Sequence, residues 1–207
     1  MKKSSLYALV ATLIFSFPGI GFGDFVYESA TGNTPSGSGV LVSSGQFFGS
    51  RFTVDELTIV TAIGGTFNSF ANDDTLFGAV VVLSDSLPQG SPFDGDELLG
   101  STVFSPLSTG DTTADLDLLL EPGNYAVIFG SGLFGADGFD SLSANGTDTP
   151  EGEGSYFFFN ATSGLWSNAS TPGERLFVRG SVVPEPAMLP LFLAFAVSFS
   201  GGRRRRI

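Results

Sequence analysis

The sequence contains no cysteine and no histidine, and these two absences remove several kinds of site at once. Without cysteine there is no disulfide framework, so stability has to come from packing. Ser-His-Asp and Cys-His catalytic arrangements and His-ligated zinc sites are likewise excluded. A pair of carboxylates working as in a glycosidase stays open, but nothing distinguishes any two of the acidic residues. We therefore expect no enzymatic activity.

Positive charge is scarce everywhere except at the two ends. The chain has nine Lys and Arg against 21 Asp and Glu, for a formal net charge of −12. Between residues 24 and 183 only Arg51, Arg175 and Arg179 face twenty acidic residues, a formal charge of −17. A surface of this sign repels nucleic acid, so no nucleic-acid partner is expected.

The N-terminus has the layout of a signal peptide. Lys2 and Lys3 precede an apolar stretch over residues 6–17, which is shorter than the roughly 20 residues that span a bilayer. Small residues, Gly21 and Gly23, stand third and first before Asp24, as a signal peptidase requires. The sequence therefore predicts a signal peptide over residues 1–23, cleaved before Asp24. A buried N-terminal helix and an uncleaved anchor are the alternatives.

The C-terminus combines a proline-rich tether, an apolar run and a basic end. Pro184 and Pro186 flank Glu185 and favour an extended backbone. An apolar run over residues 187–200 follows, interrupted by Pro190, and we expect it to form a single hydrophobic helix. The positive-inside rule keeps the final basic cluster cytoplasmic. That cluster consists of Arg203, Arg204, Arg205 and Arg206.

This three-part order resembles the PEP-CTERM sorting signal of Gram-negative bacteria that produce exopolysaccharide. The resemblance covers residues 183–207 and implies that an exosortase-type membrane protease processes the tail near Pro184, Glu185 and Pro186. It also implies transient residence in the inner membrane, then a place on the cell surface or in the extracellular matrix of a biofilm. The apolar run is shorter than that family usually shows. A plain tail anchor with a chance PEP sequence is the alternative.

The region between the ends, residues 24–182, is predicted to be one all-β domain. It has no sustained helical periodicity, and short apolar and aromatic runs alternate with clusters of turn residues. Such spacing indicates a two-sheet sandwich or jelly roll. The nine predicted strands are 25–29, 47–54, 57–63, 76–83, 98–104, 113–119, 125–129, 155–159 and 175–182. Gly64 and Gly65 are expected to end the strand that precedes them.

Acidic loops and aromatic residues supply the only candidate binding residues of this region. Asp94, Asp96 and Glu97 offer hard oxygen ligands for a structural Ca²⁺, although the spacing matches no complete calcium loop. Asp73 with Asp74, and Asp137 with Asp140, form two further acidic pairs. Solvated acidic turns are the simpler interpretation, and we expect no cofactor.

Trp166, expected in a polar loop, is the candidate residue for stacking against a sugar ring. Phe157 and Phe159 are expected in the core, because alternate residues of a strand face it. We therefore expect an exported structural or adhesive protein. A carbohydrate-binding module that recognises exopolysaccharide is the alternative.

Overall fold

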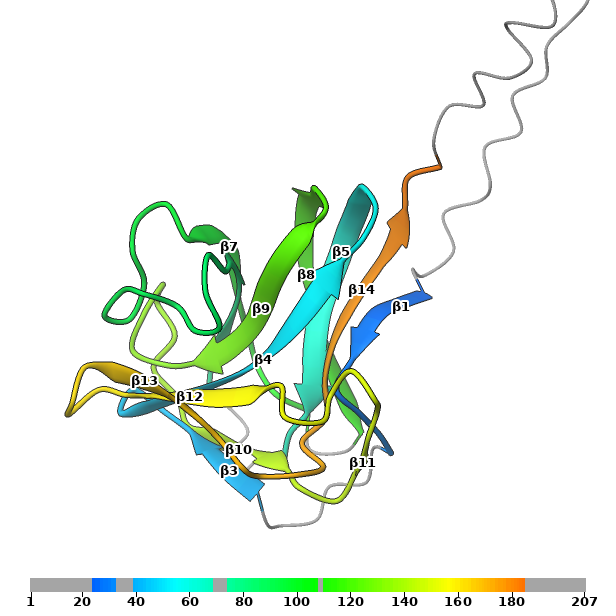
Figure 1. The fold of residues 1–207 in the computed structure, drawn as a ribbon. Coiled ribbons are helices and arrows are strands. Elements are labelled where there is room, and N and C mark those ends of the chain that lie inside the picture. Colours follow the sequence, from blue (N-terminus) through cyan, green and yellow to red (C-terminus); the bar gives the residue numbers. More distant parts are fainter. Residues whose placement is uncertain (1–23, 33–38, 69–73, 108–109, 185–207) are drawn as a thin grey trace, which may run out of the picture.

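A computed structural model describes residues 24–32, 39–68, 74–107 and 110–184. This part of the chain consists of antiparallel β-sheets joined by turns and loops, and none of its residues is helical. Figure 1 shows the strands stacked in a sandwich-like arrangement. The all-β prediction is therefore confirmed for the described residues.

Two large sheets make up the body. The smaller has four strands in the spatial order β1 (Asp24–Glu28), β14 (Leu176–Val182), β5 (Thr58–Thr66) and β8 (Asp111–Leu120). The larger has six, in the order β13 (Leu165–Asn168), β12 (Tyr156–Asn160), β4 (Gln46–Val54), β9 (Gly123–Gly130), β6 (Leu76–Val82) and β7 (Leu98–Phe104).

Two small ribbons complete the described fold. One pairs β10 (Asp140–Ser143) with β3 (Gly39–Val42), and the other pairs β11 (Thr147–Asp148) with β2 (Ala30–Thr31). Their partners lie far apart in the sequence, as Thr31 opposite Thr147 illustrates. In Figure 1 both ribbons lie at the end of the body opposite the tip of β14.

The principal core lies between the two large sheets. Alternate residues of the strands point inward, and on β5 a bulge between Val60 and Ala62 shifts the alternation by one residue. Val60 and Ile63 of β5 therefore both meet Val80 of β6 and Val127 of β9 in one buried cluster. On β4, Phe52 and Val54 are buried while Thr53 is exposed, as the alternation in the sequence predicts.

A second apolar cluster covers the opposite face of the six-stranded sheet. Phe47, Phe77 and Phe157 pack there against Phe93 from the β6–β7 loop and Leu133 from the β9–β10 loop. Because both faces of β6 are covered, its central residues are apolar without alternation. The continuous apolar run at residues 80–83 is explained in this way.

All nine predicted strands are present, with ends that differ by at most three residues. Five short strands were not predicted: β2, β3, β10, β11 and β13. The expectation for Gly64 and Gly65 was wrong, because both lie inside β5. A Cβ on Gly64 would lie 2.1 Å from the Thr112 carbonyl oxygen and 2.4 Å from the Phe177 ring, so these two groups occupy the space of a side chain at this position.

The predicted signal peptide and the predicted hydrophobic helix of the tail lie outside the described residues. Within the residues that are described, no helix is long and apolar enough to cross a membrane. The body begins and ends on neighbouring strands, because Asp24 of β1 pairs with Gly180 of β14.

Candidate functional site

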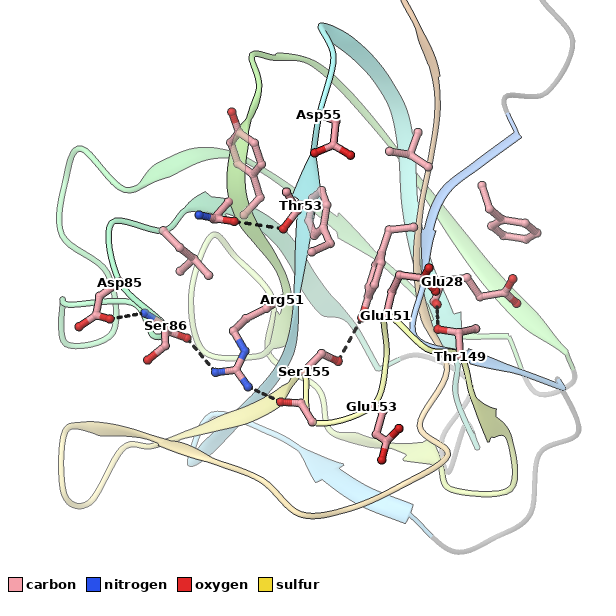
Figure 2. A pocket seen from close by; sticks show the side chains of 18 of the residues that line it. Glu28, Arg51, Thr53, Asp55, Asp85, Ser86, Thr149, Glu151, Glu153 and Ser155 are labelled. Carbon is pink, nitrogen blue, oxygen red and sulfur yellow. Dashed lines mark hydrogen bonds between the residues drawn. The ribbon is translucent and has the colours of Figure 1, made fainter.

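A groove of about 920 Å³ lies beside β1 of the smaller sheet and the C-terminal half of β4 in the larger one. We call it the corner groove. Its walls also include the beginning of β9, residues 83–86 of the β6–β7 loop, and the turn at residues 149–155 that precedes β12. Figure 2 shows Arg51 near its centre, Asp55 toward one end and Glu153 toward the other.

The corner groove forms where the pairing of β4 with β12 ends. The two strands pair from Gln46 opposite Asn160 to Ser50 opposite Tyr156. Just before β12, the chain turns away through Gly152, whose backbone passes so close to Ser29 that a Cβ would lie 1.7 Å from the Ser29 carbonyl oxygen. Of the strands that the structure describes, none pairs with β4 beyond Ser50 on that side.

Aromatic rings separate the corner groove from the core. Tyr27 of β1 stacks on Phe52 of β4 at 5.3 Å between ring centroids, and Phe52 contacts Tyr125 of β9 at 5.8 Å. All three side chains are buried, whereas Phe25, at the edge of the groove, is 41% exposed. Phe25 is therefore the most exposed of the lining rings, with the Arg179 guanidinium lying over the ring at 4.3 Å.

Hydroxyl groups form a network at the base of the groove. The Tyr27 hydroxyl lies 2.6 Å from Ser50 Oγ and 3.1 Å from Ser155 Oγ, and Ser155 Oγ donates to the Gly152 carbonyl at 2.7 Å. Burial raises the pKa of Tyr27, while hydrogen bonds from the two serines partly offset the rise. Tyr27 therefore stays neutral at physiological pH and acts as a hydrogen-bonding group rather than a base.

Among the described residues that line the corner groove, Arg51 is the only basic one, and two backbone carbonyls and the Asn168 side chain hold it in place. Its guanidinium donates to the Ser86 carbonyl at 3.1 Å, to Asn168 Oδ1 at 3.0 Å and to the Gly154 carbonyl. It also lies 6.0 Å from the centroid of Phe157. Arg51 thus ties β4 to the β6–β7 loop and to the turn before β12.

Carboxylates outnumber this arginine five to one in the lining. The Glu28 carboxylate forms an ion pair with Arg175, and the other four lie along the walls of the groove. The five carboxylate residues are Glu28, Asp55, Asp85, Glu151 and Glu153. Together with the hydroxyls they give the groove many hydrogen-bond acceptors and few cationic donors, which suits a ligand rich in hydroxyl groups.

The predicted acidic metal ligands do not converge. Asp94 and Asp96 are exposed, whereas Glu97 is only 8% exposed. Its carboxylate accepts backbone N–H groups from Gln89 at 2.7 Å, Asp94 at 3.1 Å and Gly90 at 3.3 Å. Glu97 therefore holds the β6–β7 loop in shape through its carboxylate.

The second set of acidic loop residues also serves local structure. Asp137 accepts a hydrogen bond from Thr75 Oγ1 at 2.9 Å, and Asp74 accepts one from the Phe139 backbone at 3.4 Å. Asp140 is buried at the start of β10, and Asp73 is outside the described residues. In the part of the chain that is described, no three Asp or Glu side chains gather as a metal site would require.

Trp166 lies on β13 and not in a loop, and it belongs to the second apolar cluster. Its ring centroid is 5.0 Å from Phe159 and 5.9 Å from Phe93, and its indole N–H donates to the Pro92 carbonyl at 2.7 Å. Phe157 and Phe159 are buried, as predicted. Trp166 thus pins the β6–β7 loop to the six-stranded sheet.

Residues of the predicted processing sites are only partly described. Asp24 is the first residue of β1, while Gly21 and Gly23 lie before the described range. Pro184 is exposed, and Glu185, Pro186 and the four terminal arginines lie beyond it.

No motif in the sequence predicts the corner groove. The rarity of arginine in residues 24–183 is the one feature that points toward it, because each of the three central arginines makes specific contacts. Arg175 makes two parallel bonds to Asp111 at 3.1 Å and an ion pair with Glu28, whereas Arg179 stacks on Phe25 at 4.3 Å. No family profile, no curated protein and no solved structure matches the chain.

Proposed function

We propose that this protein is exported and serves a structural or adhesive role, without catalysis, at the cell surface or in the extracellular polymer matrix. Its body is an acidic two-sheet sandwich or jelly roll, and its terminal segments are processed by a signal peptidase and an exosortase-type protease. The inner membrane holds it transiently through the tail before that processing.

One observation supports this proposal above the others: the last strand of the body ends just before the expected processing motif. β14 ends at Val182, two residues before Pro184. Among the described residues, cleavage beyond Pro184 would therefore break no strand pairing. A protease needs an accessible, extended substrate, and exposed Pro184 lies just outside the hydrogen-bonded body.

Intact mass spectrometry of the mature protein from the producing cells tests the proposal. We expect a mass that lacks residues 1–23 and everything beyond the PEP motif. A Glu185→Ala variant with the same signal peptide is the matched control, and it should keep its tail if the motif is recognised. A wild-type protein that retains the arginine cluster would contradict sorting, and a full-length soluble cytosolic protein would contradict export.

The corner groove favours one second candidate function, binding of a neutral exopolysaccharide. Carboxylates and hydroxyls along the groove match sugar hydroxyls, and the exposed part of Phe25 offers an apolar surface to sugar C–H groups.

A glycan array of the mature protein separates this candidate from a purely structural role. Binding that is lost in Phe25→Ala but kept in Trp166→Phe would assign the ligand to the corner groove, and the opposite result would assign it to the indole. Phe134→Ala is the matched control, because Phe134 is 44% exposed and does not line the groove. A blank array leaves only the structural role.

A further inference from the structure

Large apolar side chains are exposed at the end of the four-stranded sheet where the body passes into the tail. We call Leu57, Ile59 and Leu119 the exit patch; they are 38%, 43% and 62% exposed. Ile59 is the cross-strand partner of Leu119 on β8, and Leu57 lies two residues before Ile59 on the same face of the sheet. The Val183 N–H donates to the Leu57 carbonyl at 2.8 Å, so the patch lies beside the exit of the chain.

The apolar character of this area is not required by the fold. Outward positions on β8 alternate with buried ones. The two outward positions that precede Leu119 on this strand are occupied by the exposed residues Asp117 and Asp115. Polar side chains are thus compatible with this face, and along β8 the outward positions become apolar only at Leu119, beside the exit of the chain. Apolar patches kept on a soluble surface commonly mark contact sites.

The position of the tail indicates what the patch contacts. Only Pro184, Glu185 and Pro186 separate Val183 from the apolar run that begins at Ala187. Four fully extended residues span about 14 Å, so the start of that run is held close to the exit patch. If the run enters a bilayer, the patch is necessarily near the bilayer surface.

Charges around the patch restrict the kind of lipid. Asp55 and Glu56 immediately precede Leu57, and Glu121 follows β8 two residues after Leu119; all three are exposed. Their carboxylates are repelled by anionic headgroups and tolerated by zwitterionic ones.

We propose that the exit patch docks on a zwitterionic bilayer surface while the tail is inserted. The inference rests on the proposed sorting function. The apolar run has 14 residues and is interrupted by Pro190, so on its own it is a marginal anchor. A second apolar contact raises the membrane affinity of a weak anchor, just as two attached lipid chains bind a membrane more tightly than one. Processing of the tail then releases the body, because the patch alone is too small to retain it.

The absence of cysteine makes a direct test practical. Leu119→Cys and Leu165→Cys place an environment-sensitive fluorophore at positions that are 62% and 64% exposed. Figure 1 shows β13, which carries Leu165, far from the tip of β14. The full-length chain is reconstituted in phosphatidylcholine vesicles that contain brominated lipid, and flotation confirms its attachment. We expect quenching at position 119 to exceed that at position 165 by about two-fold or more, since docked apolar residues reach the acyl boundary.

The other outcomes show whether the docking proposal alone or the sorting proposal as well is wrong. Equal quenching at both positions in protein that floats overturns the docking and leaves the sorting tail intact, whereas protein that does not float overturns both proposals. A label at 119 that is shielded in a dimer without vesicles shows that a second copy covers the patch, which also overturns the docking. Replacing part of the phosphatidylcholine with phosphatidylglycerol should reduce the quenching at 119, and an increase would contradict the charge argument.

Discussion

Glu174 gives the structure a pH dependence that can be calculated and measured. Its side chain is 1% exposed, just before β14, and its Oε2 atom has no hydrogen-bond partner within the described part of the chain. Its own carbonyl accepts hydrogen bonds from Ser29 Oγ at 2.7 Å and from the Tyr156 hydroxyl at 2.9 Å. Burial raises the pKa of the Glu174 carboxyl from 4.5 to about 7, and the negative charge of Asp148 adds to the rise.

The sign of the effect follows from which state holds the proton. Below pH 4.5 the carboxyl of Glu174 is protonated in both the folded and the unfolded chain. Between pH 4.5 and about 7 the folded chain keeps a proton that the unfolded chain has lost, so stability falls as the pH rises. Each pKa unit corresponds to about 1.4 kcal/mol, so the free energy of unfolding should fall by about 3 kcal/mol across this window.

Urea denaturation at a series of pH values measures this loss, with the single tryptophan, Trp166, as the fluorescent reporter. A Glu174→Gln variant cannot ionise, so its stability relative to wild type should rise between pH 4.5 and 7 and stay level above that. Its buried amide lacks a partner, which costs about 1–3 kcal/mol at every pH. The test is therefore how the difference in unfolding free energy between variant and wild type changes with pH, and not the size of that difference at one pH.

A Glu56→Gln variant makes the same chemical change at an exposed position and serves as the matched control. The reasoning is refuted if the stability difference between wild type and Glu174→Gln is the same at pH 4.5 and at pH 7.5. That result would mean that Glu174 reaches solvent or a cation when it ionises.

Three substitutions test other parts of the fold by the same urea method. Gly64→Ala should destabilise the protein by about 1–3 kcal/mol, since its Cβ meets the Phe177 ring, whereas Gly95→Ala, with open space around its Cβ, should change little. Glu97→Gln replaces an acceptor of three backbone N–H groups and should cost about 1–3 kcal/mol; an unchanged midpoint would show that the β6–β7 loop needs no such support. Arg175→Met leaves two carboxylates without their partner and should cost about 3–5 kcal/mol, and a neutral result would show that both carboxylates reach water.

The long strands were predictable because their signal is local. In β8 the sequence alternates between apolar residues and residues such as Asp115 and Asp117, and the structure places the first set inward and the second outward. The missed strands have two to four residues, too few to show a period. They form because distant segments meet, as when Thr31 pairs with Thr147.

The candidate sites were less predictable, since a residue type does not reveal its neighbours. Glu97 and Trp166 look like binding residues in the sequence, yet loop amides occupy the carboxylate of one and Phe rings surround the other. Nothing in the sequence assigns a role to Arg51, although in the structure it anchors the wall of the corner groove. Each of these roles depends on contacts between segments far apart in the chain.

The sequence by itself determined that the body is all-β and acidic, and it predicts the two terminal segments, because alternation, charge and apolar length are properties of neighbouring residues. Only the tertiary structure decided where the faces and edges of the sheets lie. It brought β1 and β4 together to form the corner groove, and it gathered Leu57, Ile59 and Leu119 at the exit of the chain. The physical reason is that strand pairing joins distant segments through backbone hydrogen bonds, and the local sequence does not show which segments will pair.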